Sequence, residues 1–242
     1  MARNPIAWLA GSLVLLVSLS DAQTHNWTFA IAARGGITTT SRIYPNPDAS
    51  SIDLRTIDTP FNSVLSGGLE FRFKWFDDSY FFYLSTQYLS KTNSELQLDG
   101  SLSPPRRVPV EEGYRVIPVE LGTQLYVPLG ATTPWRLSMG GGFGAYYTER
   151  ILKVAGVEAV PVGSRIGFGI HVGIRGEYRL FPRVSVLGSM TFRDPEIDVK
   201  NKFTAPSIMY NNSVVNFPSG ELHSRVNIDG ITFGVGLVIE VL

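Results

Sequence analysis

Apolar and polar residues alternate with a period of two in eight separate segments of the chain, all after residue 26. The clearest is 69–75, where apolar residues alternate with Glu70, Arg72 and Lys74. A period of two is that of a β-strand, whose successive side chains point to opposite faces. The pattern therefore predicts eight strands, at 27–37, 69–75, 80–89, 117–127, 135–148, 166–180, 184–193 and 231–241.

The two faces of these strands differ sharply in charge. One face carries no charged residue in any of the eight segments. A soluble β-sandwich also alternates, so the alternation alone does not fix the environment. The charged residues on the other face are Arg34, Glu70, Arg72, Lys74, Glu120, Arg136, Arg175, Glu177, Arg179, Arg193 and Glu240.

The connections between the strands favour a membrane. Short connections at 77–79, 128–134 and 181–183 alternate strictly with long ones, rich in Pro, Ser, Asn and Asp, at 38–65, 90–115, 151–164 and 194–228. Outer-membrane barrels have short periplasmic turns and longer outer loops in this order. We therefore expect an all-β fold, a closed eight-stranded antiparallel up-and-down transmembrane β-barrel.

Aromatic residues gather at the strand ends next to the short connections. Amphipathic rings prefer the headgroup level of a membrane and form belts there. The sequence predicts such a belt from Trp27, Trp75, Phe76, Tyr80, Tyr126, Trp135, Tyr178 and Phe181. A thinner belt at the opposite end would contain Tyr88, Tyr114, Tyr147 and Phe192.

The N-terminus reads as a signal peptide. Arg3 precedes an apolar stretch at 6–19, and Ser20-Asp21-Ala22 supplies small residues for cleavage before Gln23. This apolar stretch is shorter than the roughly 20 residues of a spanning helix. We expect residues 1–22 to be a signal peptide and 23–242 a barrel domain in the outer membrane of a Gram-negative-type bacterium.

Composition removes several function classes. Charged residues make up 17% of the chain, below the usual share of about a quarter, and basic and acidic residues balance at 21 each. No basic excess indicates nucleic acid as a partner. Cysteine is absent, which excludes disulfides, thiolate metal sites and cysteine nucleophiles. We expect no cofactor and no bound metal.

The alternation and the connection pattern over 23–242 resemble the small eight-stranded outer-membrane barrels of the OmpA-like and OmpX-like group, and the "outer membrane protein β-barrel domain" and PorT-like families. Such barrels often end in an aromatic residue, whereas Leu242 is terminal here and the apolar set ends at Val241. The resemblance implies a monomer in outer-membrane lipid, inserted by the barrel-assembly machinery, with a possible extracellular ligand.

The charged face must point into a narrow interior, since about eight strands leave room only for side chains. Seven cations and four carboxylates would share this space. An unpaired buried charge is costly, so we expect an ionic network that plugs the lumen.

Little else in the sequence indicates chemistry. The glycine run 140–144 lies inside a strand, which argues against a phosphate loop. His171 would be a hydrogen-bonded interior residue. His223-Ser224, near Asp198 and Asp229, is a nucleophile-like group, but adjacent residues on an extended chain point opposite ways.

Three functions therefore stay open. We expect a non-enzymatic barrel that stabilises the envelope or binds a ligand through its long loops. A narrow channel for a small solute is the alternative, and a lipid-modifying enzyme is less favoured. A soluble lipocalin-like carrier fits the belts and connections poorly.

Overall fold

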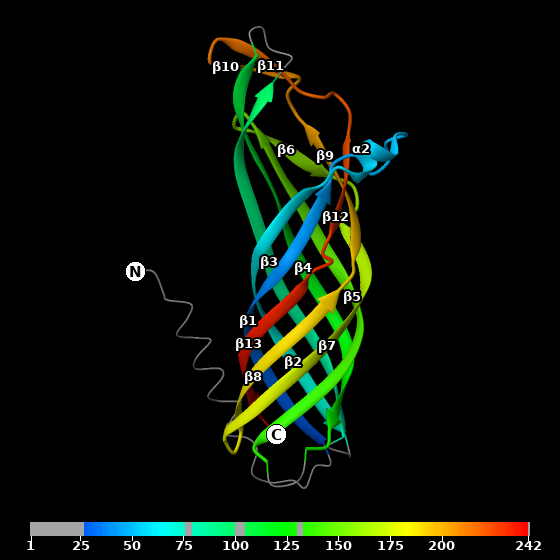
Figure 1. The fold of residues 1–242 in the computed structure, drawn as a ribbon, viewed down its shortest axis with the longest axis vertical. Helices are drawn as coiled ribbons and strands as arrows, with labels where there is room; N and C mark the ends of the chain where they lie inside the picture. The colour runs from blue at the N-terminus through cyan, green and yellow to red at the C-terminus, as the bar shows by residue number, and fades with distance from the viewer. Residues whose placement is uncertain (1–26, 76–78, 100–104, 130–132, 242) are drawn as a thin grey trace, which may run out of the picture.

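The computed structural model describes residues 27–75, 79–99, 105–129 and 133–241. The predicted signal peptide, 1–22, and its cleavage site lie outside these residues and stay predictions. The described chain is almost entirely antiparallel β-structure (Figure 1), and none of its helices is long and apolar enough to cross a membrane. The elements are β1 (Trp27–Tyr44), α2 (Ile52–Thr56), β2 (Thr59–Trp75), β3 (Tyr80–Asp99), β4 (Arg106–Val127), β5 (Trp135–Val154), β6 (Val157–Val162), β7 (Ile166–Phe181), β8 (Val184–Arg193), β9 (Glu196–Phe203), β10 (Ser207–Tyr210), β11 (Ser213–Asn216), β12 (Leu222–Asn227) and β13 (Ile231–Glu240).

The lower half is a closed ring of eight strands. β1 to β5 pair in sequence order, β5 pairs with β7, β7 with β8, β8 with β13, and β13 with β1. Ring closure satisfies the backbone of every strand inside a bilayer, where no water can replace a missing hydrogen bond. The predicted eight-stranded up-and-down barrel is confirmed.

The upper half continues the same wall with the shorter strands. β6 lies above β7 and pairs with β5 and β9, while β12 joins β9 to β1. β2 and β3 pair only up to Ser66 and Leu89 among the described ladders, so the wall is open between them above that rung. The barrel wall therefore continues above the ring of eight strands (Figure 1).

The long connections are mostly strand, so the prediction that they are loops is wrong. β4, with 22 residues, is about twice as long as the 9–11 residues that a tilted strand needs to cross a bilayer. Of the described residues, those around α2 and in the β10–β11 hairpin stand apart from the wall at the top (Figure 1).

The two strand faces exchange character between the halves, as β4 shows. In the lower half its outward residues are apolar, as at Leu121, which is 46% exposed, and its inward residues are polar, as at Glu120. In the upper half Tyr114 and Val116 are buried inside, while Arg115 is exposed outside. The lower half of the barrel thus has a polar interior and an apolar outer face. The upper half has an apolar interior and a polar outer face, as a soluble barrel does.

Candidate functional site

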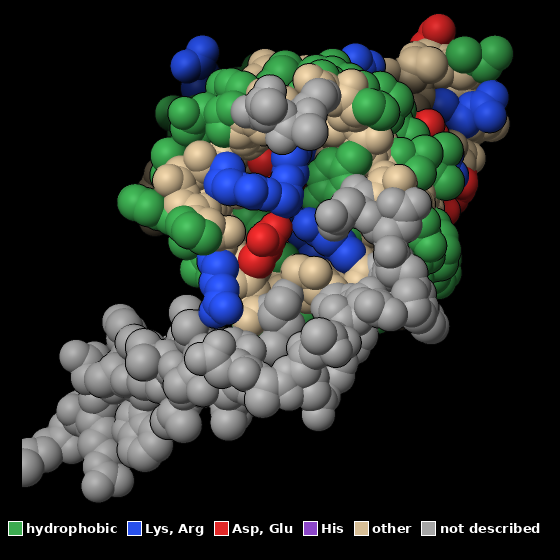
Figure 2. Space-filling model, turned by 90° about the horizontal axis from the view of Figure 1, so that it is seen from below, with side chains coloured by type: hydrophobic (Ala, Val, Ile, Leu, Met, Phe, Trp, Pro, Cys, Tyr) green, Lys and Arg blue, Asp and Glu red, His purple; other side chains and the backbone are tan. Residues whose placement is uncertain are grey.

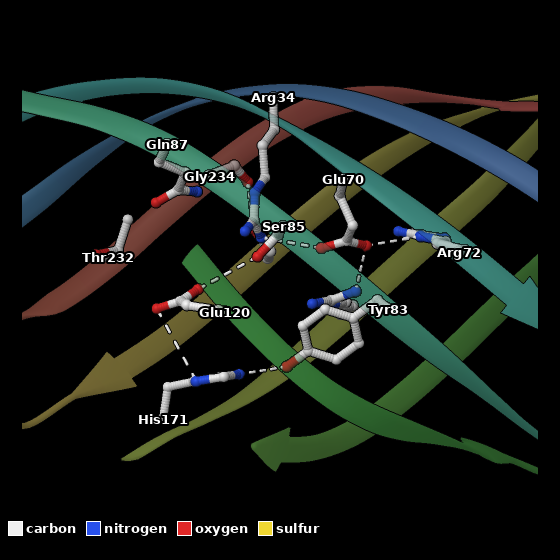
Figure 3. Close-up of polar contacts among 12 residues, drawn as sticks. Arg34, Glu70, Arg72, Tyr83, Ser85, Gln87, Glu120, His171, Thr232 and Gly234 are labelled. Carbon is white, nitrogen blue, oxygen red and sulfur yellow. Dashed lines mark hydrogen bonds and ion pairs between the residues drawn. The ribbon is translucent and has the colours of Figure 1, made fainter. Parts of the chain in front are cut away.

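Glu70 is the centre of an ion-pair cluster inside the lower barrel. Its Oε1 atom accepts hydrogen bonds from Arg72 Nε at 2.7 Å and from Arg175 Nη1 at 2.5 Å, and its Oε2 atom lies 3.6 Å from Arg34 Nη1. Arg72 Nη1 donates to Glu177 at 2.5 Å. Figure 3 shows Glu70 between Arg34 and Arg72. These five side chains are at most 4% exposed, so β1, β2 and β7 are joined by charges that water barely reaches.

Glu120 is the centre of a second cluster, higher in the lumen. Arg193 donates to both of its oxygens, from Nε at 2.6 Å and from Nη2 at 3.1 Å, and the Tyr146 hydroxyl donates at 3.0 Å. Arg193 also donates to Gln87 and Thr232, each at 2.9 Å. Charge-assisted hydrogen bonds of this kind are the strong ones in a protein interior.

His171 and Tyr83 link the two clusters. The Nε2 atom of His171 is 2.5 Å from the Tyr83 hydroxyl, its Nδ1 atom is 4.0 Å from Glu120, and the Arg175 guanidinium lies 4.3 Å from the centre of the Tyr83 ring (Figure 3). His171 faces the interior, where the sequence placed it. Gly122 makes room for this arrangement, because a Cβ atom there would lie 2.6 Å from the Tyr83 hydroxyl oxygen.

A third cluster lies at the lower mouth. Glu240 Oε1 is 2.9 Å from Arg136 Nη1 and 3.4 Å from Lys74 Nζ. Seen from below, Lys and Arg side chains surround acidic ones in the middle of the barrel, inside a rim rich in hydrophobic side chains (Figure 2). Ten of the eleven charged residues singled out in the sequence thus occupy three adjoining clusters.

Two residues differ from their expected places in the predicted lumen network and the lower aromatic belt. Tyr126 was assigned to the outer aromatic belt, but it shares the inward face of β4 with Glu120, and its ring lies 5.3 Å from that of Phe81 inside the barrel. Arg179 was assigned to the network, but it is exposed near the end of β7 and forms no ion pair with a described residue. At that last rung the lumen opens toward water, so an arginine needs no partner.

The remaining lower aromatics are outward where they are described. Trp135 and Tyr178 meet edge to face at 4.9 Å, Tyr80 packs on Phe82, and Phe181 is 64% exposed. The backbones of Trp27 and Trp75 are paired across the lowest described rung of β1 and β2. Phe76 lies outside the described residues. In the thinner upper belt, Tyr114 was misplaced, since it is fully buried inside.

Apolar residues fill the upper half. One cluster contains Ile43, Phe61, Val64, Leu89, Tyr114, Val116, Tyr146, Ile197, Val199, Val226 and Ile228. Above it, the β10–β11 hairpin packs into a second cluster, where Phe217 stacks on Phe203 at 4.4 Å. The alternation in 196–203, with charged residues outside and apolar ones inside, was a signal for this core that the sequence analysis left unused.

The nucleophile-like group does not form a catalytic arrangement. Ser224 is fully buried and bonded to Arg150 Nη1, whereas His223 points outward, where its Nδ1 atom contacts Asp48 and its Nε2 atom is 3.6 Å from Asp198. Asp229 lies beside Arg42 instead. Within the described ranges, no cluster of three or more His, Cys, Asp or Glu side chains is arranged to hold a metal.

Comparison with known proteins gives the fold its context. No family model matches the chain, and no curated protein matches it. Among solved structures, the outer membrane protein OprG of Pseudomonas aeruginosa is similar with a TM-score of 0.53 at 13% identity, covering 91% of this chain and 99% of that one. Ail, the attachment invasion locus protein of Yersinia pestis, gives 0.45 at 10% identity, with coverages of 90% and 99%.

An enzyme is also among the solved structures that match. The outer membrane protease OmpT of Escherichia coli gives a TM-score of 0.43 at 9% identity, covering 92% of this chain and 99% of that one. The closed ring of eight strands has an uncharged outward band, which agrees with the expected location in the outer membrane. The chain has the fold of the small bacterial outer-membrane β-barrels.

Proposed function

We propose that the protein is a non-enzymatic outer-membrane barrel that is closed to ions at rest and acts through its upper, extracellular half. The observation that carries this proposal is the filling of the interior at two successive levels. The ionic clusters around Glu70 and Glu120 occupy the lower half, and the two apolar clusters occupy the upper half. An ion crossing the barrel would have to break buried charge pairs and then enter an apolar core.

Exposed apolar side chains at the top support a binding role. Ile52, Leu54 and Ile57 on the projecting α2 segment are 68%, 49% and 52% exposed, although they lie far above the outward band (Figure 1). Clustered apolar side chains outside a membrane commonly mark interaction sites. This favours an envelope protein that contacts another surface or molecule from outside.

Conductance in planar bilayers tests the closed state. We expect purified wild-type protein to show no stable conductance steps. Glu120→Ala leaves Arg193 without its carboxylate partner, so we expect this variant to admit water and ions intermittently. The matched control is Glu111→Ala. It removes an exposed carboxylate on β4 that lies 3.8 Å from Lys153 on the neighbouring strand β5, and this variant should show no conductance. A large, stable wild-type conductance would instead support the narrow-channel alternative.

A cell-surface assay tests the binding role. Cells that display the wild type should adhere to an apolar test surface more strongly than cells that display a triple serine variant of Ile52, Leu54 and Ile57. Equal adherence, with equal amounts of folded barrel, would remove α2 from the proposal.

A further inference from the structure

The lower lumen has a surplus of positive charge. Of the described residues that face inward at this level, Arg34, Arg72, Lys74, Arg136, Arg175 and Arg193 carry positive charge and Glu70, Glu120, Glu177 and Glu240 carry negative charge. Two positive charges therefore lack a carboxylate. An uncompensated charge is costly in an interior of low dielectric constant, so a counter-charge from outside would stabilise the barrel.

One of the two surplus charges lies at the lower mouth and the other in the adjoining Glu70 cluster. Lys74 and Arg136 share a single carboxylate oxygen, Oε1 of Glu240, at 3.4 Å and 2.9 Å. An ammonium group has three donors and a guanidinium has five, so both keep donors to spare. Seen from below, basic side chains dominate the charged atoms that are visible inside the mouth (Figure 2).

Two buried donors at the same level are unused. Nη2 of Arg72, a residue that is only 1% exposed, has no hydrogen-bond partner among the described residues, and neither does the hydroxyl of Tyr126. Buried polar atoms without partners are rare and need an explanation.

These donors belong to one place. Lys74 Nζ lies 5.4 Å from the centre of the Tyr126 ring, and Tyr126 interacts electrostatically with Glu177, Arg72, Arg136 and Glu240. Phe81 packs against both the Arg72 guanidinium, at 4.8 Å, and the Tyr126 ring. The four donor groups therefore surround a single region at the floor of the lumen.

We infer that this floor binds a small oxyanion of the phosphate type, held by Lys74, Tyr126, Arg136 and Nη2 of Arg72. The oxygen atoms of one tetrahedral anion can accept from donors on different walls, whereas a single water molecule has only two lone pairs with which to accept. The neighbouring carboxylates, Glu177 and Glu240, do not cancel the attraction, because three cations, Lys74, Arg72 and Arg136, face these two acidic groups and leave the region net positive. The inference is independent of the role proposed for the upper half.

The test is binding of inorganic phosphate to purified full-length protein in a phosphate-free maltoside detergent. At constant ionic strength, phosphate should raise the temperature of unfolding saturably, and calorimetry should give one site. Tyr126→Phe keeps the ring on Phe81 but removes the donor, so it should weaken phosphate binding by about tenfold, as expected for one hydrogen bond to a charged group. Arg136→Gln, at a half-exposed position, should weaken it at least as much.

Two controls separate the alternatives. Lys200→Gln alters an exposed ion pair with Glu221 in the upper half and should bind phosphate like the wild type. A parallel measurement in nanodiscs with phosphatidylglycerol, against nanodiscs with an uncharged lipid, tells a headgroup phosphate from the free anion. Stabilisation by either source that is lost in Tyr126→Phe supports the site. No saturable effect in the wild type, or an equal loss in Lys200→Gln, would overturn it.

Discussion

Glu120 holds together strands that are far apart in the sequence. It lies on β4, accepts two hydrogen bonds from Arg193 on β8 and one from Tyr146 on β5, and is 1% exposed. A buried ion pair adds little net stability compared with apolar packing, but the loss of one partner leaves the other charged and unsolvated. The Glu120 carboxylate is therefore needed to compensate the buried positive charge of Arg193.

Glu120→Ala should accordingly lower the free energy of unfolding by about 3–5 kcal/mol, or less where water enters the gap. Glu111→Ala should change it by less than about 0.5 kcal/mol, as is usual for an exposed position. Urea titration of the protein in lipid vesicles measures both. Similar values for the two variants would mean that the interior charges are already hydrated.

β4 shows at the scale of an element how the environment changes along one strand. Its period of two continues without a break from Val108 to Tyr126, while the apolar face moves from inside to outside between Val116 and Ile117. In the lower part the apolar outer face contacts lipid and the polar inner face forms ion pairs. In the upper part the polar outer face contacts water and the apolar inner face packs into a core.

This reversal predicts that a charge is tolerated outside the upper wall but not outside the lower one. Val172, at the middle of β7, and Leu96, on the upper part of β3, are both outward and exposed, at 53% and 62%. Val172→Arg should cost about 2–4 kcal/mol in a bilayer, the range for arginine near the midplane. Leu96→Arg should be nearly neutral. Folding yields and urea midpoints in phospholipid vesicles test this, and equal penalties would show that the bilayer also covers the upper wall.

The same reversal explains what the sequence could and could not reveal. The eight lower strands were predictable, because a bilayer forces strict alternation on each of them. The upper strands alternate too, as in 196–203, but their charged outer residues and polar neighbours are also typical of loops. Tyr126 was misplaced because composition at a strand end suggested a belt, whereas its parity with Glu120 placed it inside. The partners of Glu70 depend on register between distant strands, which no local pattern contains.

At the scale of the whole molecule, the β10–β11 hairpin closes the upper end. Ile208, Tyr210 and Val215 reach into the cluster around Phe203, and Phe217 completes the stack. A two-residue turn, Asn211-Asn212, with φ values of 48° and 61°, leaves the tip outside. Asn tolerates this left-handed conformation better than most residues.

Phe217→Ala should release this hairpin without unfolding the barrel. Replacing a buried phenylalanine costs about 3–5 kcal/mol, which is enough to open one short hairpin for much of the time. Protease added to intact cells should then cut near residues 205–220, and the remaining barrel should stay in the membrane. Met209→Ala, at a 66% exposed position on the same hairpin, should leave the protein resistant. Cleavage of the wild type at the same rate would show that Phe217 does not hold the hairpin in place.

The exchange of faces along a strand also guards against errors of assembly. A strand such as β4 that paired one residue out of place would turn Glu120 toward the acyl chains and, by the same movement, carry Arg115 into the apolar cluster around Tyr114. In a barrel with only one of the two patterns, such a register shift would destabilise the fold in one way. In this chain it destabilises both halves at once. Correct strand pairing is thus favoured in both halves, by lipid around the lower half and by water around the upper half.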